Sequence, residues 1–384
     1  MFQNLTRFIL LTALVLCVSG ESFTPSRNMV RVAVVHEVDH CTLSVDGRYE
    51  VVDGVSGKRV EMGIRLKPSL VALEGGAIKI GDRHYENQRV LLEPRRESLI
   101  TVNDKRFRGD MMIINNAGKS ITVVNAVELE EYIRGVLYHE ISDKWPLEAI
   151  QAQAVATRTY ALYSVEKFAG RDYDMTSDIY SQVYGGQTAE RYRTNVAVRR
   201  TQGEVLTYKG KIFPAFFHAN SGGETEDASE LWDVNLPPLK GGVQSPFSVN
   251  SPHYKWRKNF WLKDIEQRLA ARGYDVGPIK ELRIVALNQS GRVRQIEIIS
   301  RAGKSVKMDG KTFREVIGPN DLKSNKYTIS MKGWFVDFAG YGWGHGVGLD
   351  QWGAYNMALL HYDYKKILEF YYPSSEIQKY DKLD

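Results

Sequence analysis

The sequence predicts an α+β protein, in which a β-rich N-terminal module precedes a domain of mixed helices and strands. From Met29 to about Val124, short β-branched and aliphatic runs alternate with turn residues such as Asp46-Gly47 and Gly75-Gly76. From Ala126 onward helical and strand patterns mix, without the regular strand–helix alternation of a doubly wound sheet. The 384 residues leave room for two or three domains.

The N-terminus has the pattern of a secretory signal. Arg7 precedes an apolar run at 8–18, and Val18-Ser19-Gly20 provides residues that a signal peptidase accepts, so we expect cleavage before Glu21 and a signal peptide at 1–20. The run is shorter than the ~20 residues of an ordinary membrane span. We therefore expect an extracytoplasmic protein (secreted, periplasmic or bound to the cell wall), with membrane contact only if the segment is retained as an uncleaved anchor.

The composition limits the classes of partner. A net charge of +5 suits an anionic wall or membrane surface, but no Lys/Arg run is dense enough to predict nucleic-acid binding. Without the signal peptide, Cys41 is the one remaining cysteine, so no intrachain disulfide is expected. We expect Cys41 to be a small buried side chain, because nothing around it supplies a base.

The expected elements follow the chain in order. Strands are predicted at 30–35, 51–52, 60–62, 70–73, 90–92, 99–102 and 121–124. Helices are expected at 127–137, 146–169, 190–202, 260–272, 311–317, 351–360 and 364–370. Hairpins are expected at 205–208 with 212–217 and at 284–287 with 293–299. We therefore expect a β-rich module at 21–125 and a second domain at 126–384, with 255–335 as an inserted helix-plus-hairpin subdomain.

A glutamate stands in an unusual position before the expected helix at 146–169. Glu140 precedes Trp145-Pro146 and an alanine-rich stretch; Pro146 favours a helix start, and Gly170 offers a left-handed stop. We place Glu140 in the short connector before this helix, where Tyr138 and Trp145 would desolvate it. Desolvation raises the pKa of a carboxyl group toward the range of a general acid. The alternative is an ordinary solvated loop acid.

Other motifs contain groups that suit sugar binding. Tyr184 lies in Gln-Val-Tyr-Gly-Gly, His218 and Ser221 lie in Phe-His-Ala-Asn-Ser-Gly-Gly, and Trp232 follows. Their rings and hydroxyls can stack on or hydrogen-bond to a sugar, while paired glycines allow close backbone approach. The alternative is that the aromatic residues fill the core and the glycines only turn the chain. The surroundings of Ser221 are not Gly-x-Ser-x-Gly, so a serine hydrolase is disfavoured.

The segment 341–354, Tyr-Gly-Trp-Gly-His-Gly-Val-Gly followed by Leu-Asp-Gln-Trp-Gly-Ala, is the most glycine-rich motif. Its glycine spacing is not that of a dinucleotide-binding fingerprint. We expect it to fold back onto residues 130–163 and to bring His345 and Gln351 to a cleft. The alternative for His345 is a purely structural imidazole.

In their order, the segments 130–163, 182–186, 217–232 and 341–354 resemble the SpoIID/LytB (stage II sporulation protein D) family, and 47–54 resembles its preceding β region. The resemblance implies a lytic transglycosylase that cleaves MurNAc–GlcNAc strands of peptidoglycan, including strands stripped of their stem peptides, with a 1,6-anhydro product. It implies Glu140 as the catalytic group and, as substrate-binding residues, Arg158, Tyr184, His218, Ser221, His345 and Gln351. No cofactor is implied.

Two alternatives accompany this resemblance. A non-catalytic amidase enhancer would bind glycan and stimulate a partner N-acetylmuramoyl-L-alanine amidase, and a third possibility is a purely structural wall-binding protein. Some relatives hold zinc with cysteines and a histidine just before the Gln-Val-Tyr motif. Here that stretch, 176–181, is Thr-Ser-Asp-Ile-Tyr-Ser and has no thiolate, so we expect no structural zinc there.

Overall fold

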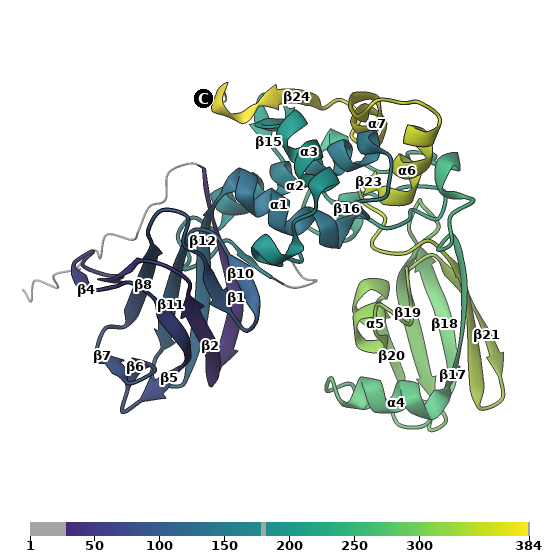
Figure 1. The fold of residues 1–384 in the computed structure, drawn as a ribbon. Helices are drawn as coiled ribbons and strands as arrows, with labels where there is room; N and C mark the ends of the chain where they lie inside the picture. Colours follow the sequence, from purple (N-terminus) through teal and green to yellow (C-terminus); the bar gives the residue numbers. More distant parts are fainter. Residues whose placement is uncertain (1–27, 178–181, 383–384) are drawn as a thin grey trace, which may run out of the picture.

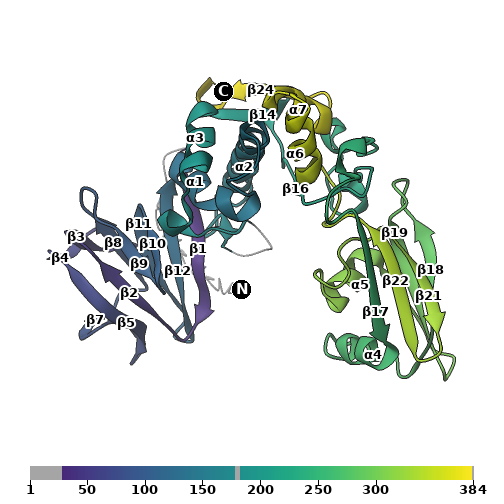
Figure 2. The same ribbon diagram turned by 45° about the vertical axis from the view of Figure 1, so that its right-hand side comes forward.

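The computed structural model describes residues 28–177 and 182–382, so the expected signal peptide lies outside the described residues. The fold is mixed α+β with a β-rich N-terminal region, which confirms the predicted fold class. Three parts are visible (Figures 1 and 2): an N-terminal β module, a central group of helices and a second β-rich part. The helices join the two β-rich parts, so the chain has the outline of an arch.

The N-terminal module consists of two sheets that share one hydrophobic core. The seven-stranded sheet has the order β13 (Met175–Thr176), β1 (Met29–Val38), β12 (Ser120–Glu128), β11 (Asp110–Asn116), β8 (Arg89–Pro94), β3 (Tyr49–Asp53) and β4 (Arg59–Gly63). The six-stranded sheet has the order β10 (Lys105–Phe107), β9 (Ile100–Val102), β2 (His40–Val45), β5 (Leu66–Glu74), β6 (Ala77–Ile80) and β7 (Arg83–Tyr85). Each predicted strand overlaps one of these strands, and Cys41 is buried between the sheets as expected.

Five helices form the centre: α1 (Leu129–Glu140), α2 (Leu147–Lys167), α3 (Tyr192–Arg200), α6 (Gln351–Leu359) and α7 (Tyr364–Tyr371). All of them were predicted to within three residues at each end. α2 contacts the other four, and its alanines at 149, 152, 154 and 156 are fully buried. Small side chains allow neighbouring helices to approach closely, so α2 becomes the central helix of the domain.

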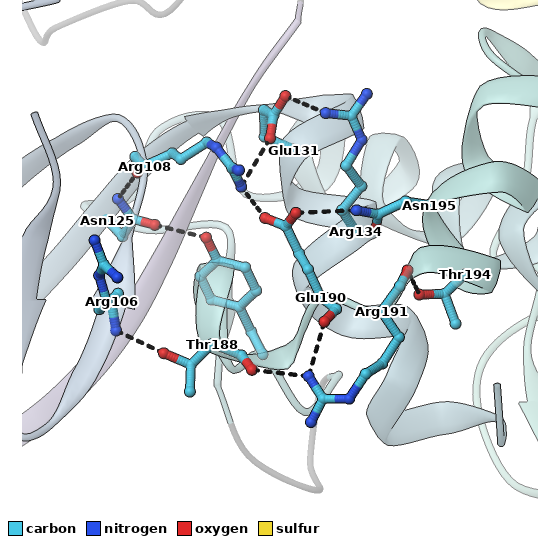
Figure 3. Close-up of polar contacts among 11 residues, drawn as sticks. Arg106, Arg108, Asn125, Glu131, Arg134, Thr188, Glu190, Arg191, Thr194 and Asn195 are labelled. Carbon is cyan, nitrogen blue, oxygen red and sulfur yellow. Dashed lines mark hydrogen bonds and ion pairs between the residues drawn. The ribbon is translucent and has the colours of Figure 1, made fainter. Parts of the chain in front are cut away.

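A network of charged side chains fixes α1 on the β module (Figure 3). Arg108, between β10 and β11, contacts the carboxylate of Glu131 on α1 at 3.1 Å and also the carboxylate of Glu190. Glu190 in turn accepts a hydrogen bond from the amide of Asn195 on α3 at 3.1 Å. These groups are partly buried, and charge-assisted hydrogen bonds of this kind are stronger than neutral ones. They therefore set the direction of α1 relative to both sheets.

The expected strand at 212–217 is wrong. The chain forms β15 (Lys211–Ile212), which pairs with β14 (Glu204–Tyr208), and a separate β16 (Phe217–His218). Pro214 lies in the break, and proline has no N–H to donate to a sheet. β16 pairs instead with β23 (Leu349–Asp350), which brings the His218 motif beside the glycine-rich segment.

The expected left-handed stop at Gly170 is also wrong. α2 ends at Lys167, and Gly170 does not have a positive φ. The carbonyl groups that follow the helix are bound instead by the guanidinium of Arg31, which donates to Arg171 O at 2.6 Å and to Phe168 O at 3.3 Å. A side chain from β1 thus takes the place of a glycine cap.

The second β-rich part has a hydrophobic core of its own, separate from that of the rest of the chain. It comprises β17 (Lys255–Trp261), α4 (Leu262–Ala270), β18 (Ile279–Leu287), β19 (Val293–Ser300), β20 (Ser305–Asp309), α5 (Gly310–Ile317), β21 (Tyr327–Lys332) and β22 (Phe335–Tyr341). The hairpin predicted at 284–287 and 293–299 is confirmed as β18–β19. The helix-plus-hairpin expectation was too simple, because β17, β20, β21 and β22 complete two three-stranded sheets.

Arg292 joins this part to the centre. It precedes β19 and is 2% exposed, and its Nη2 donates to Ser221 O at 2.7 Å and to Glu224 O at 3.0 Å. The guanidinium lies against Gly346, where a Cβ atom would stand 2.3 Å from Nη2. Because Gly346 also has a φ of +90°, no other residue fits this position without strain.

We expect Gly346→Ala to lower the free energy of unfolding by roughly 3 kcal/mol, since left-handed backbone strain and overpacking against Arg292 add. The matched control is Gly333→Ala, which has a φ of +64° but open space around it and should cost only about 1–2 kcal/mol. Urea unfolding of both variants measures the difference. Equal losses would contradict the tight contact with Arg292.

Candidate active site

Glu140 is the last residue of α1, which corrects its expected place in a connector. Its Oε1 accepts a hydrogen bond from Val183 N at 3.3 Å, and its backbone O accepts one from Gln351 Nε2 at 3.0 Å. Burial raises the pKa of the carboxyl group to about 7, and the Val183 N–H offsets this only in part. The negative end of the α1 dipole acts in the same direction as burial. The carboxyl group is therefore poised to hold a proton near neutral pH.

The expected desolvating neighbours of Glu140 are not those observed. Tyr138 is exposed and lies under the guanidinium of Arg191, and Trp145 packs against Trp352. For Tyr138 the reason is that α1 continues to Glu140, because residues two apart on a helix point to nearly opposite sides. Neither aromatic residue lines the cavity that contains the carboxyl group.

This cavity has a volume of about 600 Å³ and lies where three parts of the chain meet. One wall comes from the central domain, with Glu140, Tyr160 and Gln182–Val183. The glycine-rich segment adds Trp343, Gly344 and His345, and α6 adds Gln351. The opposite wall comes from the second β-rich part, through α5 and the loop that follows it. The prediction that the C-terminal motif folds back onto residues 130–163 is confirmed by the two hydrogen bonds of Gln351 to Glu140 and Gln153.

Two imidazole rings in the cavity wall are neutral. His218 Nδ1 lies 3.0 Å from Val347 O, so this nitrogen carries the hydrogen, and burial lowers the pKa of the ring to about 3. His345 Nδ1 accepts from Val347 N at 3.0 Å, and burial lowers the pKa of this ring well below its ordinary value. His218 Nε2 has no partner among the described residues. The pair therefore offers dipoles without adding positive charge.

Aromatic rings form a rigid floor beside these histidines. The rings of Phe216 and Trp232 are stacked with centroids 4.3 Å apart, and the ring of His345 meets Trp232 edge-on at 5.1 Å. Stacked and edge-on arrangements hold such rings in fixed orientations. This is the type of surface on which a sugar ring can lie.

Three predicted substrate-binding residues do not line the cavity. Arg158 is fully buried, and its Nε and Nη2 each donate to the Glu130 carboxylate at 2.9 Å. Tyr184 donates its hydroxyl hydrogen to Asn125 Oδ1 at 2.8 Å. Ser221 is buried, and its N–H donates to Asp350 Oδ2 at 2.9 Å. Their observed contacts are with protein groups, so substrate contact by these three stays a prediction.

The structure also adds residues that the sequence did not indicate. Lys311, Arg314 and Glu315 of α5 line the cavity. The sequence predicted their helix, but not its place at this cavity. Nothing in the sequence connects α5 to Glu140, because only the fold brings both of them to the same cavity. Asp350 is a second addition: it caps α6 by accepting from Gly353 N at 2.9 Å, and thereby positions Gln351.

Within residues 28–177 and 182–382, no three His, Cys, Asp or Glu side chains are grouped as metal ligands. Most of the stretch compared with the zinc-binding relatives, 178–181, lies outside the described residues, so the absence of zinc stays a prediction. The described helices include none that is both long and apolar enough to cross a bilayer.

Comparison with known proteins identifies the family. A family model described as stage II sporulation protein, SpoIID, matches residues 117–208, and a model of a domain of unknown function, DUF8618, matches 243–348. Stage II sporulation protein D of Bacillus subtilis (strain 168) is 31% identical over 275 residues, which cover 67% of this chain and 76% of that protein. The chain belongs to the SpoIID family.

Two further relatives extend this finding. An uncharacterized protein of Brachyspira hyodysenteriae is 30% identical over 360 residues, 94% of this chain and 95% of that protein. The amidase enhancer of Bacillus subtilis is 28% identical over 293 residues, 65% of this chain and 40% of that protein. Membership of the SpoIID family supports a function related to the cell wall.

If Arg158 is structural, Arg158→Met should lower the free energy of unfolding by about 3–5 kcal/mol, because it leaves the partly buried Glu130 carboxylate without its partner. The control is the double variant Glu130→Gln with Arg158→Met, which should lose less than the sum of the two single variants. Urea unfolding measures both. A variant of wild-type stability that no longer binds glycan would instead support substrate contact by Arg158.

Proposed function

We propose that this protein is a lytic transglycosylase that cleaves the MurNAc–GlcNAc backbone of peptidoglycan in cell-wall remodelling or sporulation. The observation that carries the proposal is the Glu140 carboxyl group, which lies in a cavity and has its pKa raised to about 7. A general acid works best when its pKa is close to the ambient pH. In this proposal the cavity holds the glycan strand, and no cofactor takes part in the reaction.

The reaction requires one group that first donates and then accepts a proton. Protonated Glu140 gives its proton to the glycosidic oxygen, and the bond from that oxygen to C1 of the muramic residue breaks with its electrons on oxygen. The carboxylate then takes the proton of the muramic C6 hydroxyl while O6 bonds to the electron-poor C1. The products are a 1,6-anhydro end and a free hydroxyl end, no water is consumed, and Glu140 is protonated again.

The surroundings of Glu140 support this chemistry. His218 and His345 are neutral because they are buried, so they add no positive charge that would oppose the cationic C1. The hydrogen bond from Gln351 to the backbone of Glu140 holds the end of α1 in place. A fixed acid needs no rearrangement during the reaction, which is an important part of enzymatic rate enhancement.

The proposed organisation is a signal peptide at 1–20, a β module at 21–125 and a catalytic domain at 126–384 with an insertion at 255–335. The separate hydrophobic core of the second β-rich part and the match of 243–348 to a distinct family model support the insertion. With a signal peptide, the protein would act outside the cytoplasm, where its proposed substrate is found.

A second candidate function is that of an amidase enhancer, which the relative of that name favours. In this case the cavity would bind glycan without cleaving it, and the protein would stimulate a partner cell-wall amidase. Purified glycan strands incubated with this protein alone separate the two functions. Anhydro ends seen by mass spectrometry support cleavage, whereas their absence together with faster release of stem peptides by an added amidase supports the enhancer.

We expect Glu140→Gln to abolish the release of 1,6-anhydro products while glycan binding is retained, because the amide has nearly the same shape but cannot exchange the proton. The control is Glu166→Gln, an exposed glutamate on α2 that does not line the cavity and should keep full activity. Mass spectrometry of the soluble products is the measurement. Unchanged turnover by Glu140→Gln would exclude Glu140 from the mechanism.

The raised pKa predicts that kcat/KM falls above about pH 7 as Glu140 loses the proton it must donate.

The free energy of unfolding should also depend on the protonation of Glu140. Its pKa is higher in the folded than in the unfolded state, so its stabilising effect is complete below the unfolded pKa and is lost as pH rises through 7. Glu140→Gln should therefore gain roughly 1–3 kcal/mol of stability relative to wild type between pH 5 and pH 8. Urea unfolding at both pH values gives this difference; no change would mean that the pKa of Glu140 is ordinary.

A further inference from the structure

The end of the second β-rich part that carries α4 points away from the central helices in both views (Figures 1 and 2). Three large aromatic side chains are exposed there: Trp334 is 60% exposed, and Trp261 and Phe335 are each 46% exposed. Trp261 and Phe335 are directly opposite partners on β17 and β22, so their side chains lie on the same face of the sheet. Trp334 is held beside them, because its backbone O accepts a hydrogen bond from Leu262 N at 2.9 Å. We call these three residues the aromatic tip.

The aromatic tip is not part of the hydrophobic core of this part of the chain. The neighbouring residues Phe260 and Val336 point to the opposite face and are buried in that core. Large aromatic side chains are mostly buried in folded proteins, and a group of exposed ones commonly marks a binding surface. The three rings are therefore available to a partner at no loss to the core.

Two cations lie on the rings of the aromatic tip. The guanidinium of Arg301, in the turn between β19 and β20, lies 4.2 Å from the centre of the Trp334 ring. The ammonium group of Lys263, on the first turn of α4, lies 5.7 Å from the centre of the Trp261 ring. A cation at this distance from an aromatic ring is attracted to the ring and still exposes its hydrogens to other acceptors.

Neither cation is neutralised by the protein. Within the part of the chain that the structure describes, no carboxylate forms an ion pair with Arg301 or Lys263. Asp264 and Asp275 are acids nearby in the chain, and they also form no ion pair with these cations. Both positive charges thus stay free for an anionic partner.

The combination of exposed tryptophan with unpaired lysine and arginine is typical of surfaces that contact lipid. Tryptophan is enriched at the boundary between headgroups and acyl chains, and the long stems of lysine and arginine let their charges reach phosphate groups. The aromatic tip consists of chain turns and strand ends that project from the molecule, whereas sites for small ligands are usually concave. An anionic phospholipid surface therefore fits the aromatic tip in both shape and charge.

The strand β22 connects the aromatic tip to the cavity that contains Glu140. It begins at Phe335 and ends seven residues later at Tyr341, a length of roughly 20 Å. Trp343, two residues beyond its end, lines the cavity. A surface bound at the tip would thus lie at a fixed distance from the cavity, because a strand within a sheet is stiff.

We infer that the aromatic tip binds the surface of an anionic phospholipid membrane, with its rings among the headgroups and Arg301 and Lys263 at lipid phosphates. This contact would hold the Glu140 cavity at a set height above the bilayer. The inference goes beyond the proposed glycan cleavage and does not depend on it. It also does not depend on the N-terminal segment.

Vesicle binding tests this inference. Protein beginning at Glu21 keeps every described residue and excludes a contribution from the apolar run at 8–18. Co-sedimentation gives Kd for vesicles of mixed phosphatidylglycerol and phosphatidylcholine and for vesicles of phosphatidylcholine alone. Wild type should bind the anionic vesicles more tightly, and added salt should weaken this binding because it screens the charges.

Two sets of variants separate the rings from the charges. Trp334→Ser should raise Kd for anionic vesicles about tenfold, because one large apolar surface no longer leaves water. Lys263→Gln combined with Arg301→Gln should raise Kd for anionic vesicles at least roughly tenfold and leave Kd for neutral vesicles unchanged. All of these side chains are exposed, so equal urea unfolding midpoints should show that the fold is retained.

Bromine-labelled lipids give a second readout, since bromine quenches the fluorescence of a tryptophan that reaches the bilayer. Vesicle binding should quench part of the fluorescence of the seven tryptophans. The double variant Trp261→Phe with Trp334→Phe should keep most of the binding, because phenylalanine also enters the interface, but lose the quenching. Quenching that persists in this variant would place the contact elsewhere on the molecule and overturn the inference.

Matched controls come from α3. Tyr192→Ser removes an aromatic side chain that is 82% exposed, and Arg199→Gln with Arg200→Gln removes two exposed positive charges. These variants should bind vesicles as wild type does. Equal losses in the tip variants and the α3 variants would overturn the inference, as would wild type that does not bind anionic vesicles.

Two other occupants would also be recognised. Tip variants that bind purified glycan strands more weakly but vesicles unchanged would assign the aromatic tip to the wall polymer. A dimer seen by light scattering that is lost in Trp334→Ser, without vesicle binding by wild type, would assign it to a second copy of the chain. Either result would overturn the inference, whereas a failure to form anhydro ends would affect only the proposed catalysis.

Discussion

The geometry of the candidate site depends on the hydrogen bond between the side chain of Gln351 and the backbone carbonyl of Glu140. The last carbonyl groups of a helix have no partner within the helix, and a buried carbonyl without one is costly. Gln351 supplies that partner from the start of α6, and Asp350 fixes the start of α6 by capping it. Residues 211 positions apart in the chain are thereby joined at the carboxyl group that the proposed reaction uses.

A second constraint places the opposite wall of the cavity. The buried guanidinium of Arg292 binds the carbonyls of Ser221 and Glu224, and Glu226 Oε2 accepts hydrogen bonds from Asn288 at 2.8 Å and Ser290 at 2.9 Å. Several buried hydrogen bonds between two parts of a chain favour one arrangement of these parts, since another arrangement would leave more of the buried polar groups unpaired. The second β-rich part is in this way held against the segment that contains the Ser221 motif, and α5 is held over the cavity.

Burial shifts the pKa values of the acid and of the two imidazoles in this site in opposite directions. It favours the neutral form of every titratable group, so it raises the pKa of Glu140 and lowers the pKa values of His218 and His345. Both rings are therefore neutral at pH 7, whereas Glu140, with a pKa of about 7, is divided between its protonated and ionised forms at this pH.

The sequence by itself determined the helices, part of the strands and the identity of the motifs. Helices such as α2 could be predicted because Pro146 and the alanine-rich pattern act locally, and the turn at Lys209-Gly210 predicted the β14–β15 hairpin. Short strands such as β7 and β10 were missed, because three residues carry too little pattern to be distinguished from a loop. Longer strands such as β2, β11 and β22 were missed as well.

Only the tertiary structure decided which motif residues face the cavity. Arg158, Tyr184 and Ser221 stand in motifs beside Glu140, His218 and Gln351, yet the first three are paired with protein groups. It also decided that α5, from a separate hydrophobic core, brings Lys311 to the same cavity. The physical reason is that the burial and the hydrogen-bond partners of a side chain depend on segments far apart in the chain. A sequence pattern reflects only the interactions between residues that are close in the chain.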